Sequence, residues 1–262
     1  MKSKYHYDVI IVGGSYAGLA ATMALGRALK KVLIIDSELP CNRQTPYSHN
    51  FLTNDGNTPK DIAALARLQV GRYPTVSFLS GRVISGKGDG DAFEVFTEAR
   101  EIYSARKLIF ATGIRDILAP IDGLAACWGI SVIHCPYCHG YEVKGEPTGL
   151  LSNGEAGFDF ARLISNWTTD LTLFTNGISI LSGDQQVQLV GRGIAVVEKE
   201  VSMLEQDNGQ LRNVLFSDGS AYPLKVLYAP GSFEQHCKVP EEMGCELTEE
   251  GILRLMYLVK QH

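Results

Sequence analysis

The sequence of 262 residues contains no apolar run close to the ~20 residues that a membrane-spanning helix needs. It also lacks a basic excess: 24 lysines and arginines against 29 acidic residues give a formal net charge of −5, which is not typical of a nucleic-acid-binding protein. The N-terminal segment has no apolar secretion signal before its first strand. These absences predict a soluble, cytoplasmic protein without nucleic-acid or membrane partners.

Cysteine is scarce as well. The six cysteines are scattered along the chain and are too few for a disulfide scaffold. Only Cys135 and Cys138 form a close C-x-x-C pair, and a histidine stands on each outer side of it. A zinc site would need two more ligands, and Cys237 and Cys245 do not form a second C-x-x-C. We therefore expect no metal site. Redox chemistry is the favoured interpretation of the pair, while a zinc module and two thiols without a role stay open as alternatives.

The order of apolar runs indicates two β–α–β units in series. Residues 7–13 and 31–36 are short apolar strands on either side of a helix-forming stretch. Thr58 and Pro59 are typical of a helix start, and from residue 75 the apolar period becomes two. That alternation predicts an antiparallel meander that returns to the first sheet at residues 107–113. Residues 147–177 then repeat the strand, glycine turn, helix and strand.

The first glycine turn, residues 13–18, has the pattern G-x-G-x-x-G with serine in place of the second glycine. It follows a strand and opens a helix, so its backbone N–H groups and the helix dipole can hold a pyrophosphate. Asp36 ends the next strand, at the ~20-residue spacing from which an acid accepts hydrogen bonds from ribose hydroxyls. We predict a bound adenine dinucleotide here; the alternative is an ordinary tight turn.

The second glycine turn, residues 152–157, keeps Gly154 and Gly157 but begins with Ser152. Glu155 adds a negative charge in the first helical turn, where it competes with phosphate. The following strand ends at residues 175–177 with neither an acid for a ribose nor an arginine for a 2′-phosphate. A nicotinamide-nucleotide site and a fold that no longer binds a nucleotide both stay open.

The sequence HCPYCHG, residues 134–140, combines the two cysteines with groups that can tune them. A cysteine near a helix N-terminus or a cation has a lowered pKa and reacts as the thiolate. Pro136 stiffens the loop, and His134 and His139 can supply protons or stabilise a thiolate.

These motifs, in this order, resemble those of the low-molecular-weight thioredoxin reductases and their relatives. The segments GGSYAGL, PCNRQTP and CPYCHGYE are most similar to a branch that also contains dithiol oxidases of small natural products. The resemblance implies an α/β fold with two Rossmann-like three-layer ββα nucleotide-binding domains of the FAD/NAD(P)-binding type. Residues 1–116 would start the FAD domain, residues 117–230 would form the NAD(P)-binding-like domain with the C-x-x-C, and residues 231–262 would return to the FAD domain.

The resemblance also implies roles for individual residues. Cys135 corresponds to the thiol that exchanges with the substrate, and Cys138 to the thiol that exchanges electrons with the flavin. His139 stands where the family has an acid and can act as general acid–base. The positions that would contact the cofactor are Gly13, Gly14, Ser15, Ala17, Gly18 and Asp36 in the first turn and strand, Thr112 and Gly113 after the return strand, and Gly154 and Gly157 in the second turn.

The chain departs from the family at its end, because residues 231–262 contain no Gly-Asp pair of the kind that contacts the flavin phosphates. We therefore expect a truncated sequence in which the C-terminal part of the FAD domain is incomplete.

The function expected from the sequence is that of an FAD-dependent thiol–disulfide oxidoreductase, a homodimer acting on a thioredoxin-like protein or on a small dithiol or disulfide. NADPH as the donor stays open because the arginines for its 2′-phosphate are missing. Two alternatives remain: an oxygen-dependent dithiol oxidase that does not use NADPH, and a non-catalytic truncated flavoprotein fold or redox-responsive binding module.

Overall fold

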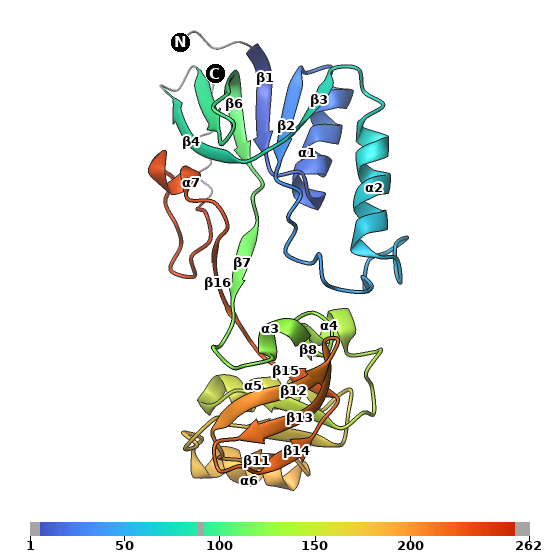
Figure 1. Cartoon of the computed structure of the whole chain (residues 1–262), viewed down its shortest axis with the longest axis vertical. Coiled ribbons are helices and arrows are strands. Elements are labelled where there is room, and N and C mark those ends of the chain that lie inside the picture. The colour runs from blue at the N-terminus through green and yellow to red at the C-terminus, as the bar shows by residue number, and fades with distance from the viewer. Residues whose placement is uncertain (1–5, 89–91, 255–262) are drawn as a thin grey trace. The chain divides into compact units, whose positions relative to one another are not determined.

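The computed structural model describes residues 6–88 and 92–254. Residues 89–91, which fall within the predicted meander, and the end of the chain after residue 254 therefore lie outside the described residues. The chain forms two compact units. Unit 1 consists of residues 1–43, 60–116 and 233–262, and unit 2 consists of residues 44–59 and 117–232 (Figure 1).

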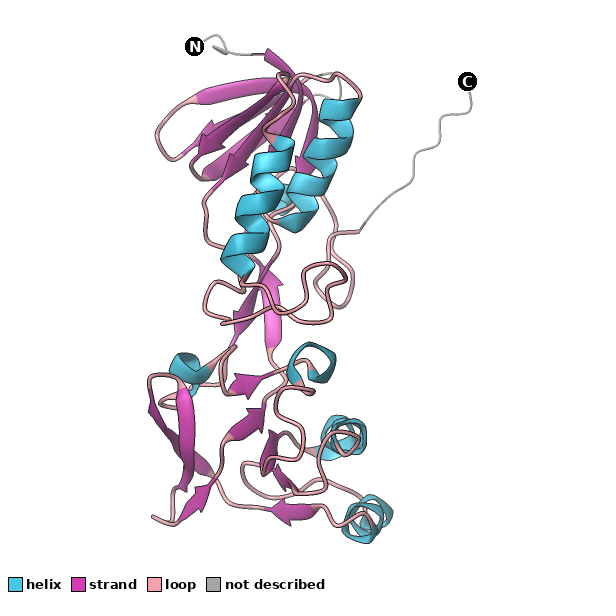
Figure 2. Cartoon of the chain, turned by 90° about the vertical axis from the view of Figure 1, so that its right-hand side faces the viewer, coloured by secondary structure: helices cyan, strands magenta, loops and turns pink. Residues whose placement is uncertain are grey.

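Unit 1 is built on a mixed six-stranded sheet of order β3-β2-β1-β6-β5-β4. The predicted apolar runs form its central strands, which are buried because helices and other chain segments cover them. Helices α1 and α2 lie beside one another on one face (Figures 1 and 2). The elements are β1 (His6–Val12), α1 (Tyr16–Arg27), β2 (Val32–Asp36), α2 (Pro59–Val70), β3 (Val76–Ser80), β4 (Val83–Gly88), β5 (Phe93–Thr97) and β6 (Ile102–Phe110).

One predicted strand pairing is wrong. The alternating residues that start at residue 75 were expected to begin the antiparallel meander, but β3 pairs in parallel with β2, from Val32 opposite Val76 to Asp36 opposite Ser80. The reason is the connection: α2 lies between these strands, and a strand–helix–strand crossover returns the chain in the same direction. The alternation of β3 reflects its place at the sheet edge. Only β4, β5 and β6 form the meander.

Unit 2 contains a parallel five-stranded sheet of order β11-β10-β9-β15-β8 and an antiparallel three-stranded sheet of order β12-β13-β14. Its elements are α3 (Leu124–Cys127), β8 (Val132–Ile133), α4 (Pro136–His139), β9 (Thr148–Leu151), α5 (Gly154–Ile164), β10 (Leu171–Phe174), α6 (Gly183–Gly191), β11 (Ala195–Val197), β12 (Val201–Asp207), β13 (Gln210–Phe216), β14 (Ala221–Pro223) and β15 (Val226–Tyr228).

The parallel sheet of unit 2 has an apolar core on each face. Leu173 packs into a cluster with Phe158 of α5 and Leu189 of α6. The next residue, Phe174, belongs to a second cluster that contains Val214 of β13. Successive strand residues point to opposite faces, so the helices cover one face and the three-stranded sheet covers the other. This confirms the predicted three-layer α/β arrangement for this unit.

The remaining elements are β7 (Ile114–Ile117), β16 (Ser232–Gln235) and α7 (Val239–Glu242). Strands β7 and β16 pair with each other as a two-stranded ribbon. Within the described ranges, none of the helices is both long and apolar enough to cross a membrane.

A buried serine connects the strand before the cysteine pair to the three-stranded sheet. The hydroxyl of Ser131 donates to the carbonyl of Gly209 at 2.6 Å and accepts from the amide of Leu211 at 3.0 Å. These two partners lie at the turn between β12 and β13. We expect Ser131→Ala to lower the free energy of unfolding by about 1–3 kcal/mol, because it leaves two buried backbone groups unpaired.

The matched control is Ser202→Ala, since Ser202 is exposed and its hydroxyl makes one bond, to the carbonyl of Leu215. Its cost should stay within about 0.5 kcal/mol in the same urea titration. Equal costs for the two variants would contradict the role given to Ser131.

Candidate functional site

The first glycine turn is closely packed against the strand ends around it. Gly13 has φ +104°, and a Cβ there would overlap the backbone of Ala111. A Cβ on Gly18 would overlap the carbonyl oxygen of Gly13, and one on Gly14 would lie 2.7 Å from the Cβ of Asp36. Each glycine is therefore required because no side chain fits, which is the property predicted for a turn that approaches a pyrophosphate.

The start of α1 is available to an anion. Ser15 is the N-cap residue in an extended conformation, and its side chain makes no capping hydrogen bond. The first turn of α1 contains no acidic residue, and Ala17 is exposed. The helix dipole and its first N–H groups therefore favour a phosphate at this end.

The other predicted cofactor residues of unit 1 gather at the same strand ends. Asp36 is half-buried at the end of β2, directly beside Gly14. Thr112 and Gly113 follow β6, whose end is held to the end of β1 by the 2.7 Å hydrogen bond from the amide of Ala111 to Val12. The cradle fits the pyrophosphate of FAD, and the carboxylate of Asp36 lies beside Gly14 in it. Direct contact of each residue with FAD stays a prediction.

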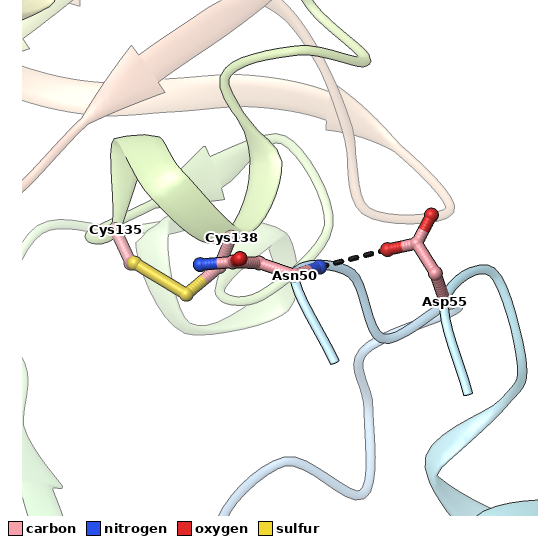
Figure 3. The surroundings of a disulfide bond; sticks show 4 residues. All are labelled: Asn50, Asp55, Cys135 and Cys138. Carbon is pink, nitrogen blue, oxygen red and sulfur yellow. Dashed lines mark hydrogen bonds between the residues drawn. A yellow bond between two sulfur atoms is a disulfide. The ribbon is translucent and has the colours of Figure 1, made fainter. Parts of the chain in front are cut away.

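The cysteine pair occupies one helical turn directly after β8. Cys135 is the N-cap of α4, Pro136 is its first residue, and the amides of Cys138 and His139 both donate to the carbonyl of Cys135 at 3.2 Å. One turn of helix brings the two cysteines to a Cα–Cα distance of 5.3 Å, and their sulfurs form a disulfide (Figure 3). The predicted close pair is thus a disulfide in the structure.

Imidazole groups flank this disulfide. His134 stacks on the buried ring of Trp128, with a centroid distance of 5.5 Å and an interplanar angle of 19°. His139 is half-buried, and burial lowers the pKa of its imidazole. The nearby His134 lowers that pKa further, whereas the carboxylate of Glu142 raises it. A neutral imidazole at neutral pH can accept a proton, as the predicted acid–base role requires.

Residues 44–59 bring further groups to α4 that the sequence analysis left without a role. The Nδ1 atom of His49 lies 3.4 Å from Glu142 and 3.7 Å from Asp55. The amide of Asn50 donates to Asp55 at 2.8 Å, a bond that Figure 3 shows beside the disulfide. No local motif in this segment signals these contacts, because the tertiary fold alone brings it to α4.

The side chain of Asn153 fills the second glycine turn. The Oδ1 atom of Asn153 accepts from the amides of Gly154 at 2.8 Å and Ile180 at 3.0 Å, and its Nδ2 donates to the carbonyl of Ile178 at 2.9 Å. Gly154 has φ +59°, and a Cβ there would lie 3.0 Å from the side chain of Ile180. Gly157 packs on the backbone of Ser152. The amide of Gly154 is thus already paired.

A cavity of about 220 Å³ lies at the ends of β9, β10 and β15. Among the described residues, its lining includes no lysine or arginine that could hold a 2′-phosphate. The lining residues are Leu118, Ala119, Leu124, Trp128, Leu151, Ser152, Asn153, Thr175, Asn176, Ala229, Pro230 and Gly231.

Comparison with known proteins identifies the family. The pyridine nucleotide-disulphide oxidoreductase family matches residues 7–255, and the chain belongs to it. Thioredoxin reductase tcpT of Claviceps purpurea is 34% identical over 224 residues, which are 81% of this chain and 70% of that protein. Thioredoxin reductase aclD of Aspergillus oryzae is 32% identical over 238 residues, 87% of this chain and 72% of that protein.

A solved structure agrees with this assignment. The crystal structure of an oxidoreductase from Agrobacterium tumefaciens has a TM-score of 0.87 and 37% sequence identity, and the match covers 93% of this chain and 81% of that one. Together these findings confirm the resemblance to thioredoxin reductases, the α/β nucleotide-binding fold and an oxidoreductase enzyme of an FAD-binding family.

The packing around Gly18 gives a test of the FAD cradle. We expect Gly18→Ala to lose bound flavin, because its methyl group would collide with the carbonyl of Gly13 and open the turn. Gly81→Ala is the matched control, since a Cβ at that position meets nothing within 4 Å. Flavin content is read from the visible spectrum at equal protein concentration. Full flavin in the Gly18 variant would contradict the assignment.

The burial of His139 gives a test by titration. We expect an NMR titration to place the pKa of His139 below its ordinary value of 6.5, because burial disfavours the charged imidazole. Its contribution to stability is therefore present above pH 6.5 and is lost as the pH falls. Glu142→Gln should lower the pKa further, because it removes a carboxylate that stabilises the cation. His139→Gln identifies the resonance. A pKa above 6.5 would refute this description of the site.

Proposed function

We propose that the chain is an FAD-dependent thiol–disulfide oxidoreductase that passes electrons between the flavin, the Cys135–Cys138 disulfide and an external dithiol or disulfide. The observation that carries the proposal is the disulfide closed across one turn of α4 with the half-buried His139 beside it. Membership in the pyridine nucleotide-disulphide oxidoreductase family supports it.

The two cysteines divide the work. When the substrate is an external dithiol, one thiolate of the substrate attacks Cys135 Sγ. The Cys135–Cys138 bond then breaks, and Cys138 leaves as a thiolate. The second thiol of the substrate then displaces Cys135, so the substrate is oxidised to a disulfide and the pair is reduced. His139 accepts the proton that the attacking thiol loses. The same steps in reverse reduce a disulfide.

FAD, when bound, supplies the two-electron acceptor or donor for the reduced or oxidised pair. Gly13, Gly14 and Gly18 leave room for its pyrophosphate, and the N-terminus of α1 at Ser15 and Ala17 stabilises the phosphate charge. In this proposal the carboxylate of Asp36 accepts hydrogen bonds from the ribose. Thr112 and Gly113 stand at the end of β6, beside the same cradle.

The names of the relatives suggest a thioredoxin-like protein as one partner, and a small dithiol or disulfide is the other class. The family resemblance is the support for a homodimer, whereas a cytoplasmic location is proposed from the composition of the sequence.

A second candidate, an oxygen-dependent dithiol oxidase, is favoured by the second glycine turn. Asn153 already pairs the amide of Gly154, and Glu155 adds negative charge to the start of α5. The cavity beside this turn has no cation for the 2′-phosphate of NADPH. In this version a dithiol would be the electron donor, and oxygen, reduced to hydrogen peroxide, would be the acceptor that reoxidises bound FAD. Anaerobic addition of NADPH distinguishes the candidates, because a reductase flavin is bleached by it and an oxidase flavin is not.

Replacement of the inner cysteine tests the electron relay. We expect Cys138→Ser to abolish bleaching of the flavin by a dithiol under anaerobic conditions, because the pair can no longer close its disulfide. Cys41→Ser is the matched control, since Cys41 is an exposed free thiol outside the pair, and it should keep the wild-type rate. Bleaching of the Cys138 variant at the wild-type rate would overturn the proposed route.

A further inference from the structure

A second cavity in unit 2, of about 250 Å³, lies directly against the redox turn. Two of its lining residues, Pro136 and Tyr137, stand between the two cysteines in the sequence. The wall of the cavity is therefore part of the turn that carries the disulfide. The lining residues are His49, Asn50, Asp55, Pro136, Tyr137, Tyr141, Glu142 and Trp167.

Three aromatic rings form much of the lining. Tyr137 meets Trp167 edge to face at a centroid distance of 5.5 Å, a favourable arrangement for two aromatic rings. Trp167 also packs against Gly140, where a Cβ would lie 2.9 Å from the indole ring. The ring of Tyr141 already holds a cation, because the Lys144 ammonium lies 3.5 Å from its centroid. Such ring faces attract positive charge.

The charged groups of the lining are mostly negative. Glu142 and Asp55 each carry a carboxylate, and the imidazole of His49 lies between them. None of the eight lining residues is a lysine or an arginine. The Lys144 ammonium already covers the ring of Tyr141. The cavity therefore combines two carboxylates with the rings of Tyr137 and Trp167, a combination that can recognise an ammonium group.

We propose that this cavity is a specificity subsite that takes the cationic substituent of a small dithiol while its sulfurs exchange with the Cys135–Cys138 pair. The inference rests on the proposed function and adds the substrate class to it. Sites that enclose a whole drug-sized ligand have volumes of about 300–1,000 Å³. This cavity, at about 250 Å³, is smaller and therefore suits one substituent of a ligand. Glu142 is a specificity-determining residue in this scheme and forms no bond to sulfur. Because it also raises the pKa of His139, the ratio of the rates with two dithiols, and not either rate alone, reports on the subsite.

The reaction at the subsite is the exchange described above. A thiolate of the bound dithiol forms a mixed disulfide with Cys135 and releases Cys138. The second thiol of the substrate then closes the substrate disulfide and releases Cys135. Two electrons move from the substrate to the pair, and the pair ends as two thiols.

The test compares two dithiols of the same carbon chain. Dithiothreitol is neutral, and 2-amino-1,4-butanedithiol carries an ammonium group. The full chain is mixed with each dithiol, quenched with iodoacetamide at set times and analysed by mass spectrometry for reduction of the Cys135–Cys138 disulfide. This readout does not depend on the flavin, and bleaching of the flavin is recorded in parallel.

The variants separate the subsite from general charge and from intrinsic thiol reactivity. Glu142→Gln should lower the preference for the ammonium dithiol by about two- to fivefold, the size expected for the loss of one partly exposed ion pair. Glu205→Gln removes the same charge from exposed β12, outside the lining, and should keep the wild-type preference. The preference is the rate of reduction by the ammonium dithiol divided by the rate with dithiothreitol. The intrinsic reactivity of each free dithiol is the same for all variants, so it cancels when the preferences of two variants are compared.

An unchanged preference in the Glu142 variant overturns the subsite, and so does an equal drop in the Glu205 variant. If the pair shows the expected preference but the flavin is never bleached, the proposed function fails and the subsite stands. If neither dithiol reduces the pair, the proposed function and the subsite fail together.

Discussion

The disulfide across α4 is the constraint on which this account depends. A strand of two residues, β8, leads straight into a helical turn whose N-cap is one cysteine and whose third residue is the other. The parallel sheet holds β8 through β15, and the buried hydroxyl of Ser131 ties it to the opposite sheet. A small redox group is thus fixed to the rigid core of unit 2, while its neighbours His139 and Glu142 remain partly accessible.

The two strand–turn–helix units share a glycine pattern but differ in how well they can bind an anion. In the first, the glycines pack against the backbone of Gly13 and Ala111 and the side chain of Asp36, and the start of α1 has no acidic residue and no side-chain cap. In the second, the side chain of Asn153 fills the turn and uses the amide of Gly154. An anion is favoured at the first turn and meets a paired amide and Glu155 at the second.

Much of this could be predicted from the sequence because it is local. The apolar runs of β1 and β2, the glycine turn between β1 and α1, and the closeness of Cys135 and Cys138 depend on neighbouring residues. The parallel pairing of β3 was missed because its alternation is also typical of a meander, and the intervening helix decides. The contact of His49 with Glu142 and the bonds of Asn153 to residues 178–180 join distant segments, so no local pattern announces them.

The visible absorption spectrum of the purified chain, taken as isolated and again after addition of FAD and gel filtration, tests the central claim most directly. The account predicts a flavin band with about one FAD per chain, because the close packing at Gly13, Gly14 and Gly18 and the start of α1 favour its pyrophosphate. A chain that is folded by circular dichroism but retains no flavin after FAD is added would contradict it.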